Sequence, residues 1–237
     1  MLKKLFSKKK KNNIVYSNKN GIGYIMYEND HVTIVHDSCR ICYNKKVDNT
    51  YEEKLKYIAS KVKLGHESIL EHSNVIIKLE LNKELYPELA IVLSHCRYLN
   101  TKVKEVDGMI SVLIGGSIRG YKHIIRTMDE FTNNKVFNIL FELMYELPYC
   151  YFEDLIEDEI FDRYRFKNLD SKVKVEMEGE EIIKQLRYMG TKVQRDKFDI
   201  VGIDDVTYVY NQLSEKEKLV FTIDDILDLT SLTILFK

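Results

Sequence analysis

The segment Val75-Ile76-Ile77-Lys78-Leu79-Glu80-Leu81 carries the clearest structural signal in this chain of 237 residues. All of its odd-numbered positions are apolar, whereas Lys78 and Glu80 occupy two of the three even-numbered ones. Because successive side chains of a strand point to opposite faces, this period of two predicts a β-strand with one face in the protein core.

The sequence after this strand predicts a helix and then a β-hairpin. Residues 84–99 carry an apolar stripe at helical spacing, which indicates an amphipathic helix. Asp107-Gly108 is a hairpin-type turn, and it leads into a short apolar strand over residues 109–114. The run Gly115-Gly116-Ser117 then opens a helix that is expected to end near Met128.

Regular elements are also expected on either side of this unit. From Tyr24 the pattern becomes β-like, and residues 31–35 are predicted to form a short strand. The run Thr50-Tyr51-Glu52-Glu53 has the spacing of a helix capping box, and the helix that it starts is expected to stop at Gly65. Residues 132–147 are predicted to form another amphipathic helix.

The pattern of apolar and polar residues changes over the last seventy residues. Residues 173–177 alternate and are predicted to form a strand, residues 180–189 are predicted to form a short amphipathic helix, and residues 232–236 a terminal apolar strand. The whole pattern predicts an α+β fold in which a mixed antiparallel sheet packs against long helices, followed by a small C-terminal α/β extension. The predicted divisions are a basic flexible tail at 1–13, a core at 14–165 and an extension at 166–237.

Composition argues against several classes of protein. The chain has 36 Lys and Arg against 37 Asp and Glu and is 45% hydrophobic, unlike a disordered chain or a strongly basic nucleic-acid-binding domain. There is neither an apolar run of roughly 20 residues nor the apolar stretch of a signal peptide. Four scattered cysteines fit a reducing compartment. We therefore expect a cytoplasmic protein without a membrane or nucleic-acid partner, although the lysines at 8–11 leave contact with an anionic surface open.

Residues 65–72, with the sequence Gly-His-Glu-Ser-Ile-Leu-Glu-His, form the most concentrated polar cluster in the chain. They place two imidazoles, a hydroxyl and two carboxylates in a corner between a helix and a strand. One interpretation is a corner that contacts a ligand. The other is plain capping, with His66 stabilising the end of the preceding helix and Ser68 forming a second capping box with Glu71. The spacing of the two histidines does not match a zinc-binding helix, so no metal site is predicted.

The run Gly115-Gly116-Ser117-Ile118-Arg119 is the second candidate. Free backbone N–H groups at a helix start, a small hydroxyl and a guanidinium have the chemistry of a phosphate-binding cradle. His123 follows Arg119 by one turn on the same helix face. The alternative is an ordinary turn, because the run matches neither a dinucleotide-binding fingerprint nor a Walker loop.

The cysteines supply a weaker candidate. Cys39 and Cys42 form a CxxC pair, which binds zinc or undergoes redox chemistry only in contexts that this sequence does not provide. Cys96 and Cys150 are single and lie on apolar helix stripes. Packing in the core is therefore the favoured interpretation for the cysteines.

These clusters occur in an order that resembles the flavin-dependent thymidylate synthases. Residues 65–72 match the family's Gly-His-x-Ser-x-x-Glu-His block before a strand, and Arg40-Ile41-Cys42 resembles its Ala-Arg-Val-Ser segment before a helix. Residues 116–123 resemble the Gly-Asn-x-Arg-x-x-x-His helix start of the family, and Phe152-Glu153 resembles the end of its next helix. The resemblance covers about residues 25–160.

The resemblance implies a flavin enzyme that methylates dUMP to dTMP. The carbon would come from methylenetetrahydrofolate, NADPH would reduce the bound FAD, and the protein would be a homotetramer with its sites at subunit interfaces. It assigns no catalytic residue here. The residues that it implies for FAD binding are His66, Ser68, Glu71, Ser117, Arg119 and His123. The first three belong to the flavin corner, and the last three hold the phosphates and the adenosine side.

The sequence also departs from the family. Where the Arg-His-Arg signature that binds FAD and nucleotide is expected, residues 93–98 read Leu-Ser-His-Cys-Arg-Tyr. Met128 stands in place of an arginine that meets the nucleotide, and Ser117 stands where asparagine is usual. Without those cations, a phosphate and a developing enolate lack their electrostatic partners.

Two interpretations of these departures remain. One is a degenerate or split family member whose signature lies on a second chain or was lost, because residues 228–237 look like the strand that normally leads into the signature. These residues also read as an ordinary amphipathic terminal strand, which would carry no such implication. The other is a catalytically silent relative that acts as an interaction or assembly partner.

Overall fold

The structure is a computed structural model, and it describes residues 13–28, 30–42, 45, 49–96, 98–127, 134–157, 172–175 and 203–229. Several predictions lie outside these ranges: the basic tail up to residue 12, the division between residues 165 and 166, the helix at 180–189 and the terminal strand at 232–236. Those predictions therefore stay predictions.

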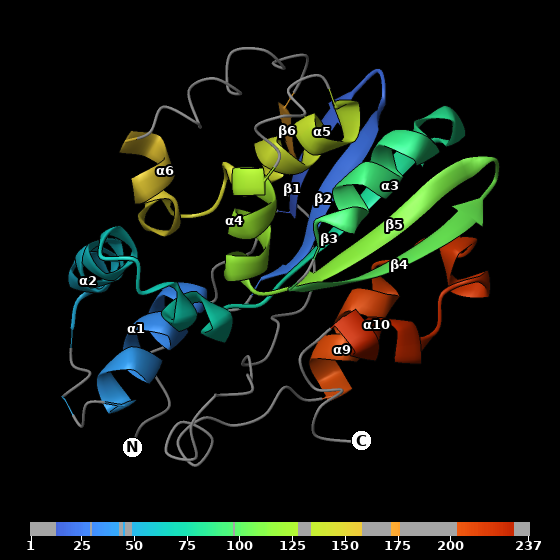
Figure 1. Cartoon of the computed structure of the whole chain (residues 1–237). Helices are drawn as coiled ribbons and strands as arrows, with labels where there is room; N and C mark the ends of the chain where they lie inside the picture. Colours follow the sequence, from blue (N-terminus) through green and yellow to red (C-terminus); the bar gives the residue numbers. More distant parts are fainter. Residues whose placement is uncertain are drawn as a thin grey trace.

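The centre of the molecule is a six-stranded sheet in which every neighbouring pair of strands is antiparallel (Figure 1). Its spatial order is β4-β5-β3-β2-β1-β6. The strands are β1 (Asn13–Asn18), β2 (Gly21–Glu28), β3 (Val75–Asn82), β4 (Leu99–Val106), β5 (Met109–Gly116) and β6 (Lys172–Val175). With helices on both faces, this sheet confirms the α+β prediction.

The structure also contains the following helical elements, of which those labelled η are short 3-10 helices. They are α1 (His31–Cys42), α2 (Tyr51–Lys63), η1 (Glu67–His72), η2 (Lys83–Leu85), α3 (Tyr86–Ser94), α4 (Ile118–Thr127), α5 (Lys135–Met144), η4 (Tyr149–Tyr151), α6 (Glu153–Glu157), α9 (Ile203–Asn211), η5 (Glu217–Leu219) and α10 (Ile223–Leu229). Within the described residues, no helix is long and apolar enough to span a membrane.

Local sequence signals set several of these boundaries as predicted. The Thr50 side chain accepts the Glu53 N–H while the Glu53 carboxylate accepts the Thr50 N–H, so the predicted capping box starts α2. The turn between β4 and β5 is made by Asp107 and Gly108, which both have positive φ. Strand β3 spans Val75–Asn82 and contains the whole segment that was predicted from its alternation.

The predicted strand at 31–35 is wrong, because these residues begin helix α1. The Asp30 carboxylate accepts the Thr33 N–H at 3.4 Å, and the Asp30 carbonyl accepts the Ile34 N–H at 2.9 Å, as at a helix N-cap. Val32 and Val35 are three residues apart and both are buried in the core. Helical packing therefore outweighs the strand preference of this short apolar run.

The predicted helix at 84–99 is shorter than expected. Helix α3 ends at Ser94, and Leu99 is the first residue of β4. Strand β4 pairs along all of β5, from Leu99 opposite Gly116 to Val106 opposite Met109. Because Leu99 takes part in this ladder of backbone hydrogen bonds, it belongs to the sheet. Its apolar side chain continues the helical spacing of residues 84–99 in the sequence but not the helix in the structure.

The sheet separates two hydrophobic cores. Odd-numbered β3 residues such as Ile77 and Leu79 face the larger core, which helices α1 to α5 complete. Ile76 faces the opposite side, where residues 203–229, here called the C-terminal cap, cover the sheet. Figure 1 shows α3 on one side of the β4–β5 hairpin and α10 on the other. The apolar residues of the second core are Met26, Tyr27, Ile76, Leu113, Val206, Val209, Leu213, Phe221, Ile226 and Leu229.

A buried ion pair lies under the C-terminal cap. The Lys78 ammonium donates to both Glu217 carboxylate oxygens, at 3.2 and 3.1 Å, and the Ser111 hydroxyl donates to the same carboxylate at 2.8 Å. Burial alone would raise the pKa of Glu217. The Ser214 N–H, the Lys78 charge and the Ser111 hydroxyl outweigh that effect, so the pKa of Glu217 lies below its usual value. Glu217 is therefore held as a carboxylate.

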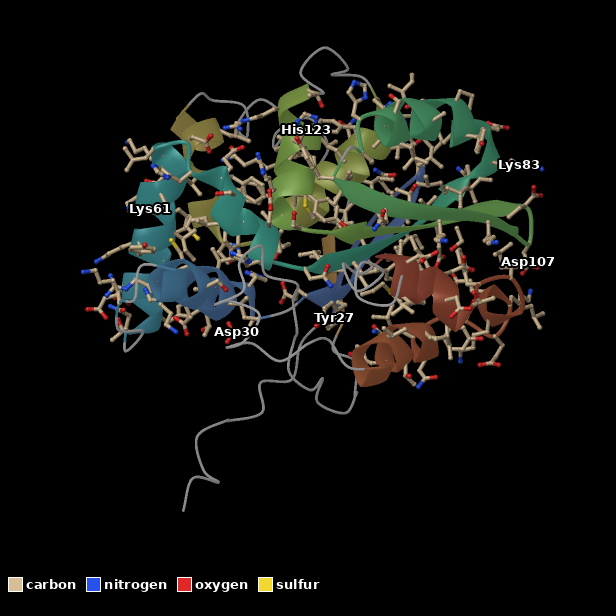
Figure 2. All side chains as sticks on the ribbon, turned by 60° about the horizontal axis from the view of Figure 1, so that its bottom comes forward. Tyr27, Asp30, Lys61, Lys83, Asp107 and His123 are labelled. Atoms are coloured by element: carbon tan, nitrogen blue, oxygen red, sulfur yellow. The ribbon has the colours of Figure 1, made fainter. Side chains whose placement is uncertain are left out.

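A second set of ion pairs fixes the outer part of the C-terminal cap. The Lys102 ammonium of β4 lies 3.3 Å from Asp225 and 2.8 Å from Asp228 on α10. Lys216 pairs with Asp107 at the tip of the hairpin, where Figure 2 shows Asp107 beside the C-terminal elements. Charged residues that are far apart in sequence therefore align this cap on the sheet.

Candidate functional site

Sheet register brings the two predicted clusters together. In the antiparallel pair of β3 and β5, Val75 lies opposite Gly116. The polar cluster at 65–72 ends just before β3 begins, and α4 starts just after β5 ends. Both clusters must therefore lie at the same end of the sheet. We call the region formed by residues 66–73 and 117–126 the η1–α4 corner.

His66 enters the η1–α4 corner through the end of α2. Gly65 has a φ of 77°, its N–H donates to the Val62 carbonyl, and the His66 N–H donates to the Lys61 carbonyl. This pair of bonds is a Schellman motif, as expected when glycine follows a helix. The backbone of His66 thus caps α2 while its side chain is exposed and makes no cap hydrogen bond to η1.

Ser68 and Glu71 lie on η1 and are both exposed. The N-cap of this short helix is His66, so Ser68 does not hold the N-cap position that the capping-box interpretation gave it. The Glu71 carboxylate instead accepts a hydrogen bond from the Arg119 guanidinium of α4. This ion pair joins the two clusters that the sequence singled out.

A buried serine fixes the geometry of the joint. The Ser73 hydroxyl donates to the Leu70 carbonyl at 2.5 Å and accepts the Ile118 N–H at 2.7 Å. One of the backbone N–H groups at the start of α4, which the cradle interpretation left for a phosphate, is therefore used within the protein. Ser117 is only 8% exposed, so it is the least accessible of the six predicted FAD residues.

Charges in the corner are matched in number. Arg119, Lys122 and Arg126 lie along one face of α4, and the carboxylates of η1 and α6 face them. The pairs are Arg119–Glu71, Lys122–Glu67, Lys122–Asp154, Arg126–Glu67 and Arg126–Asp154. Three cations thus meet three carboxylates. An anionic ligand that binds here must compete with a carboxylate for its cation.

An aromatic side chain completes the corner. The Arg119 guanidinium lies 5.3 Å from the centre of the Tyr98 ring, and the His123 ring meets the same ring edge-on at 5.4 Å. Figure 2 labels His123 on α4. Tyr98 comes directly before β4, whose first residue Leu99 also lies opposite Gly116. A third element therefore reaches the same end of the sheet.

Two glycines allow this close approach. A Cβ atom on Gly116 would lie 2.8 Å from the Leu99 side chain and 3.0 Å from the Tyr98 carbonyl. A Cβ atom on Gly120 would lie 2.6 Å from the Leu99 side chain. Gly116 also has a φ of 151°, which residues with a side chain rarely adopt. Both glycines therefore serve packing, and this favours the ordinary-turn interpretation of Gly116.

The exposed donors of the corner fit parts of a flavin nucleotide. His66 and Ser68 offer an imidazole and a hydroxyl at the surface, and the partly exposed Arg119 and His123 offer a guanidinium and a second imidazole. These groups suit phosphate, ribose and ring nitrogen atoms. Among the described residues of the corner the charges are matched, so these residues provide no excess positive charge for a diphosphate. To contact Arg119, a phosphate of FAD would have to draw it away from Glu71.

Cys39 and Cys150 are buried in the core, and the partly buried Cys96 packs against it. Cys39 is buried, with its sulfur 3.2 Å from the Tyr57 hydroxyl. Burial raises the pKa of Cys96 to about 12, and burial followed by the charge of Glu153 raises that of Cys150 to about 12. Among the described residues, no group of three or more His, Cys, Asp and Glu could hold a metal ion.

Sequence reasoning missed several members of the corner. Lys122 and Arg126 follow Arg119 at spacings of three and seven, which would have identified a basic helix face. Tyr98 and Asp154 have no such local signal, because only the folded chain brings them to α4. No family model and no curated protein matches this chain.

Proposed function

We propose that this chain is a flavin-dependent thymidylate synthase homologue that binds FAD at the η1–α4 corner. The observation that carries the proposal is the Glu71–Arg119 ion pair. It joins the two sequence blocks that resemble separate FAD-binding motifs of the family. The α+β fold, in which an antiparallel sheet positions both blocks, supports the same proposal.

In this proposal different residues of the corner bind different parts of the cofactor. His66 and Ser68 contact the flavin nucleotide, and Glu71 lies beside them on η1 and holds Arg119 until a phosphate displaces it. Ser117, Arg119 and His123 hold the phosphates and the adenosine side, with Ser117 the most enclosed of the three. When bound, FAD would supply the redox chemistry, with NADPH and methylenetetrahydrofolate as co-substrates and dUMP as the methyl acceptor.

The replaced arginines and the charge balance of the corner argue against turnover by this chain alone. The arginines that the family uses for the nucleotide are replaced, and the cations of α4 are already paired with carboxylates. We therefore propose a homo-oligomer, a tetramer by resemblance, in which thymidylate synthesis requires a second chain that supplies Arg-His-Arg. A catalytically silent relative that acts as an assembly partner is the second candidate, and the same charge balance favours it.

The absorbance spectrum of the purified protein tests flavin binding. We expect a yellow protein with close to one flavin per chain, or one that acquires this flavin when FAD is added. A colourless protein that ignores added FAD would overturn the proposal. Formation of dTMP only after addition of a chain with the Arg-His-Arg signature would separate the first candidate from the silent relative.

A further inference from the structure

Tyr98 is a half-exposed aromatic residue at the edge of the η1–α4 corner. It is 50% exposed, while the next residue, Leu99, is buried. Its carbonyl lies in close approach to Gly116 and Gly120, so the backbone of Tyr98 is packed tightly against α4. The ring itself contacts Arg119 and His123, so its position at the surface is restricted and less conformational entropy is lost if a ligand stacks on it.

The neighbours of Tyr98 suit a ligand with both a flat ring and negative charge. The Arg119 guanidinium lies over the tyrosine ring, and the His123 imidazole meets it edge-on. Aromatic rings and guanidinium planes stack with nucleobases, and the same guanidinium binds phosphate oxygens. A nucleotide presents a base and a phosphate together, so its chemistry matches this trio.

Geometry favours adenine over the flavin ring as the stacked group. In FAD a single ribose joins adenine to the diphosphate, whereas a longer ribityl chain separates the flavin ring from it. Tyr98 and Arg119 are in direct contact. A ring that stacks on Tyr98 while its phosphate reaches Arg119 must therefore be the adenine, which a single ribose joins to the diphosphate.

We infer that Tyr98 is the stacking platform for the adenine ring of FAD, with Arg119 and His123 beside it. The inference rests on the proposed function, because it places one part of the proposed cofactor. It assigns a binding role to the last residue of the segment 93–98, in which the Arg-His-Arg signature is not found. It also gives a reason for an exposed tyrosine beside a paired arginine.

The test compares FAD with FMN, which lacks the adenosine, on the full chain. Flavin binding is titrated for the wild type, Tyr98→Leu, Tyr98→Phe and Tyr86→Leu. Tyr86 is the control because it is 54% exposed and lies on α3. We expect Tyr98→Leu to weaken FAD binding about tenfold and leave FMN binding unchanged, a loss typical of one base–aromatic stack. Tyr98→Phe and Tyr86→Leu should bind both flavins as the wild type does.

The absence of tryptophan from the sequence allows a second measurement. Tyr98→Trp and Tyr86→Trp each introduce a single tryptophan, and ADP is added to both variants. Stacking of adenine should change the emission of Tyr98→Trp and leave that of Tyr86→Trp unchanged. This readout does not depend on Tyr98→Leu remaining folded.

The outcomes separate this inference from the proposed function. If the wild type binds FAD but Tyr98→Leu binds it within twofold of the wild type, the stacking role is wrong and the proposed function stands. Equal weakening of FAD and FMN would overturn the assignment to adenine. A wild type that binds no flavin would overturn the proposed function, and the inference with it.

Discussion

The carboxylate of Glu71 is paired with the guanidinium of Arg119, although 48 residues separate them in the sequence. The pair closes the end of the sheet where β3 begins and β5 ends, because Val75 lies opposite Gly116. It therefore ties η1 to α4 at the place where both predicted binding motifs are found. The first two predictions below test what each partner of this pair does.

Removing side chains from the corner should weaken FAD binding without unfolding the protein. Arg119→Ala should weaken FAD binding by about tenfold or more, since it deletes a charge-assisted hydrogen-bond donor, and His66→Ala should weaken it by a smaller factor. Because both side chains are at the surface, the free energy of unfolding should change by less than about 1 kcal/mol. Flavin titration and urea unfolding measure the two quantities.

The control for these variants is Lys83→Ala. It removes a cation from another exposed ion pair, the one with Glu105 at 2.8 Å. It should leave FAD binding unchanged. Wild-type affinity in both Arg119→Ala and His66→Ala would show that the corner is not the flavin site.

Glu71→Gln should tighten FAD binding by a few-fold. The neutral amide no longer competes with a phosphate for Arg119, so the guanidinium becomes available to the ligand. The difference from the wild type should shrink as salt is added, because salt screens exposed charges. Titrations at two salt concentrations measure it, with Glu105→Gln as the matched control. Weaker binding in Glu71→Gln would instead mean that this carboxylate contacts the ligand.

Glu217→Gln should lower the free energy of unfolding by roughly 1 to 3 kcal/mol. The change removes the more buried of the two carboxylates that pair with the Lys78 ammonium, and Glu80 at 2.7 Å is left to compensate this charge only in part. The exposed Glu215, which pairs with Lys218, provides the control, and Glu215→Gln should stay within about 0.5 kcal/mol of the wild type. The double variant Lys78→Met/Glu217→Leu should recover part of the loss. Urea unfolding of the four proteins gives the comparison.

Acid should weaken the attachment of the same cap. The pKa of Glu217 lies below the usual 4.5, so its contribution to stability is complete at neutral pH and is lost as the pH falls through the lowered pKa. Unfolding free energies measured between neutral pH and pH values below 4.5 should therefore fall less steeply for Glu217→Gln than for the wild type. Identical pH profiles for the two proteins would contradict this account of the ion pair.

Cys96 and Cys150 should resist thiol reagents in the folded protein. Burial raises the pKa of each to about 12, so the reactive thiolate is scarce near neutral pH. Mass spectrometry after iodoacetamide treatment should find both unmodified in the native protein and fully modified in urea. Rapid labelling of either cysteine in the native protein would rule out the packing role.

The parts of the fold that could be predicted from sequence have local causes. The alternation in residues 75–81 identifies β3, and the capping box at Thr50 identifies the start of α2. Helix α1 was mistaken for a strand because Val32, Thr33, Ile34 and Val35 are all β-branched. Its helical state depends on Asp30 and on burial against the core, which a short window does not reveal.

The candidate site likewise has parts that could be predicted from local sequence and parts that could not. The motif residues on η1 and α4 could be found because each motif is contiguous in sequence. Their pairing, and the approach of Tyr98 and Asp154, depend on strand register and on α6, and no local pattern encodes either. The close contact of Leu99 with Gly116 and Gly120 likewise exists only in the folded sheet.

The two faces of the sheet are completed at different times during protein synthesis. Among the described residues, the larger core ends at Leu155, whereas the second core extends to Leu229. At the rate of ribosomal synthesis, the C-terminal cap that covers the second face is made on the order of ten seconds after the larger core is complete. During that interval Met26, Ile76 and Leu113 form an apolar face on the nascent chain, the kind of surface that chaperones recognise. The yield of folded protein in a cell will therefore depend on what protects this face until the C-terminal cap emerges.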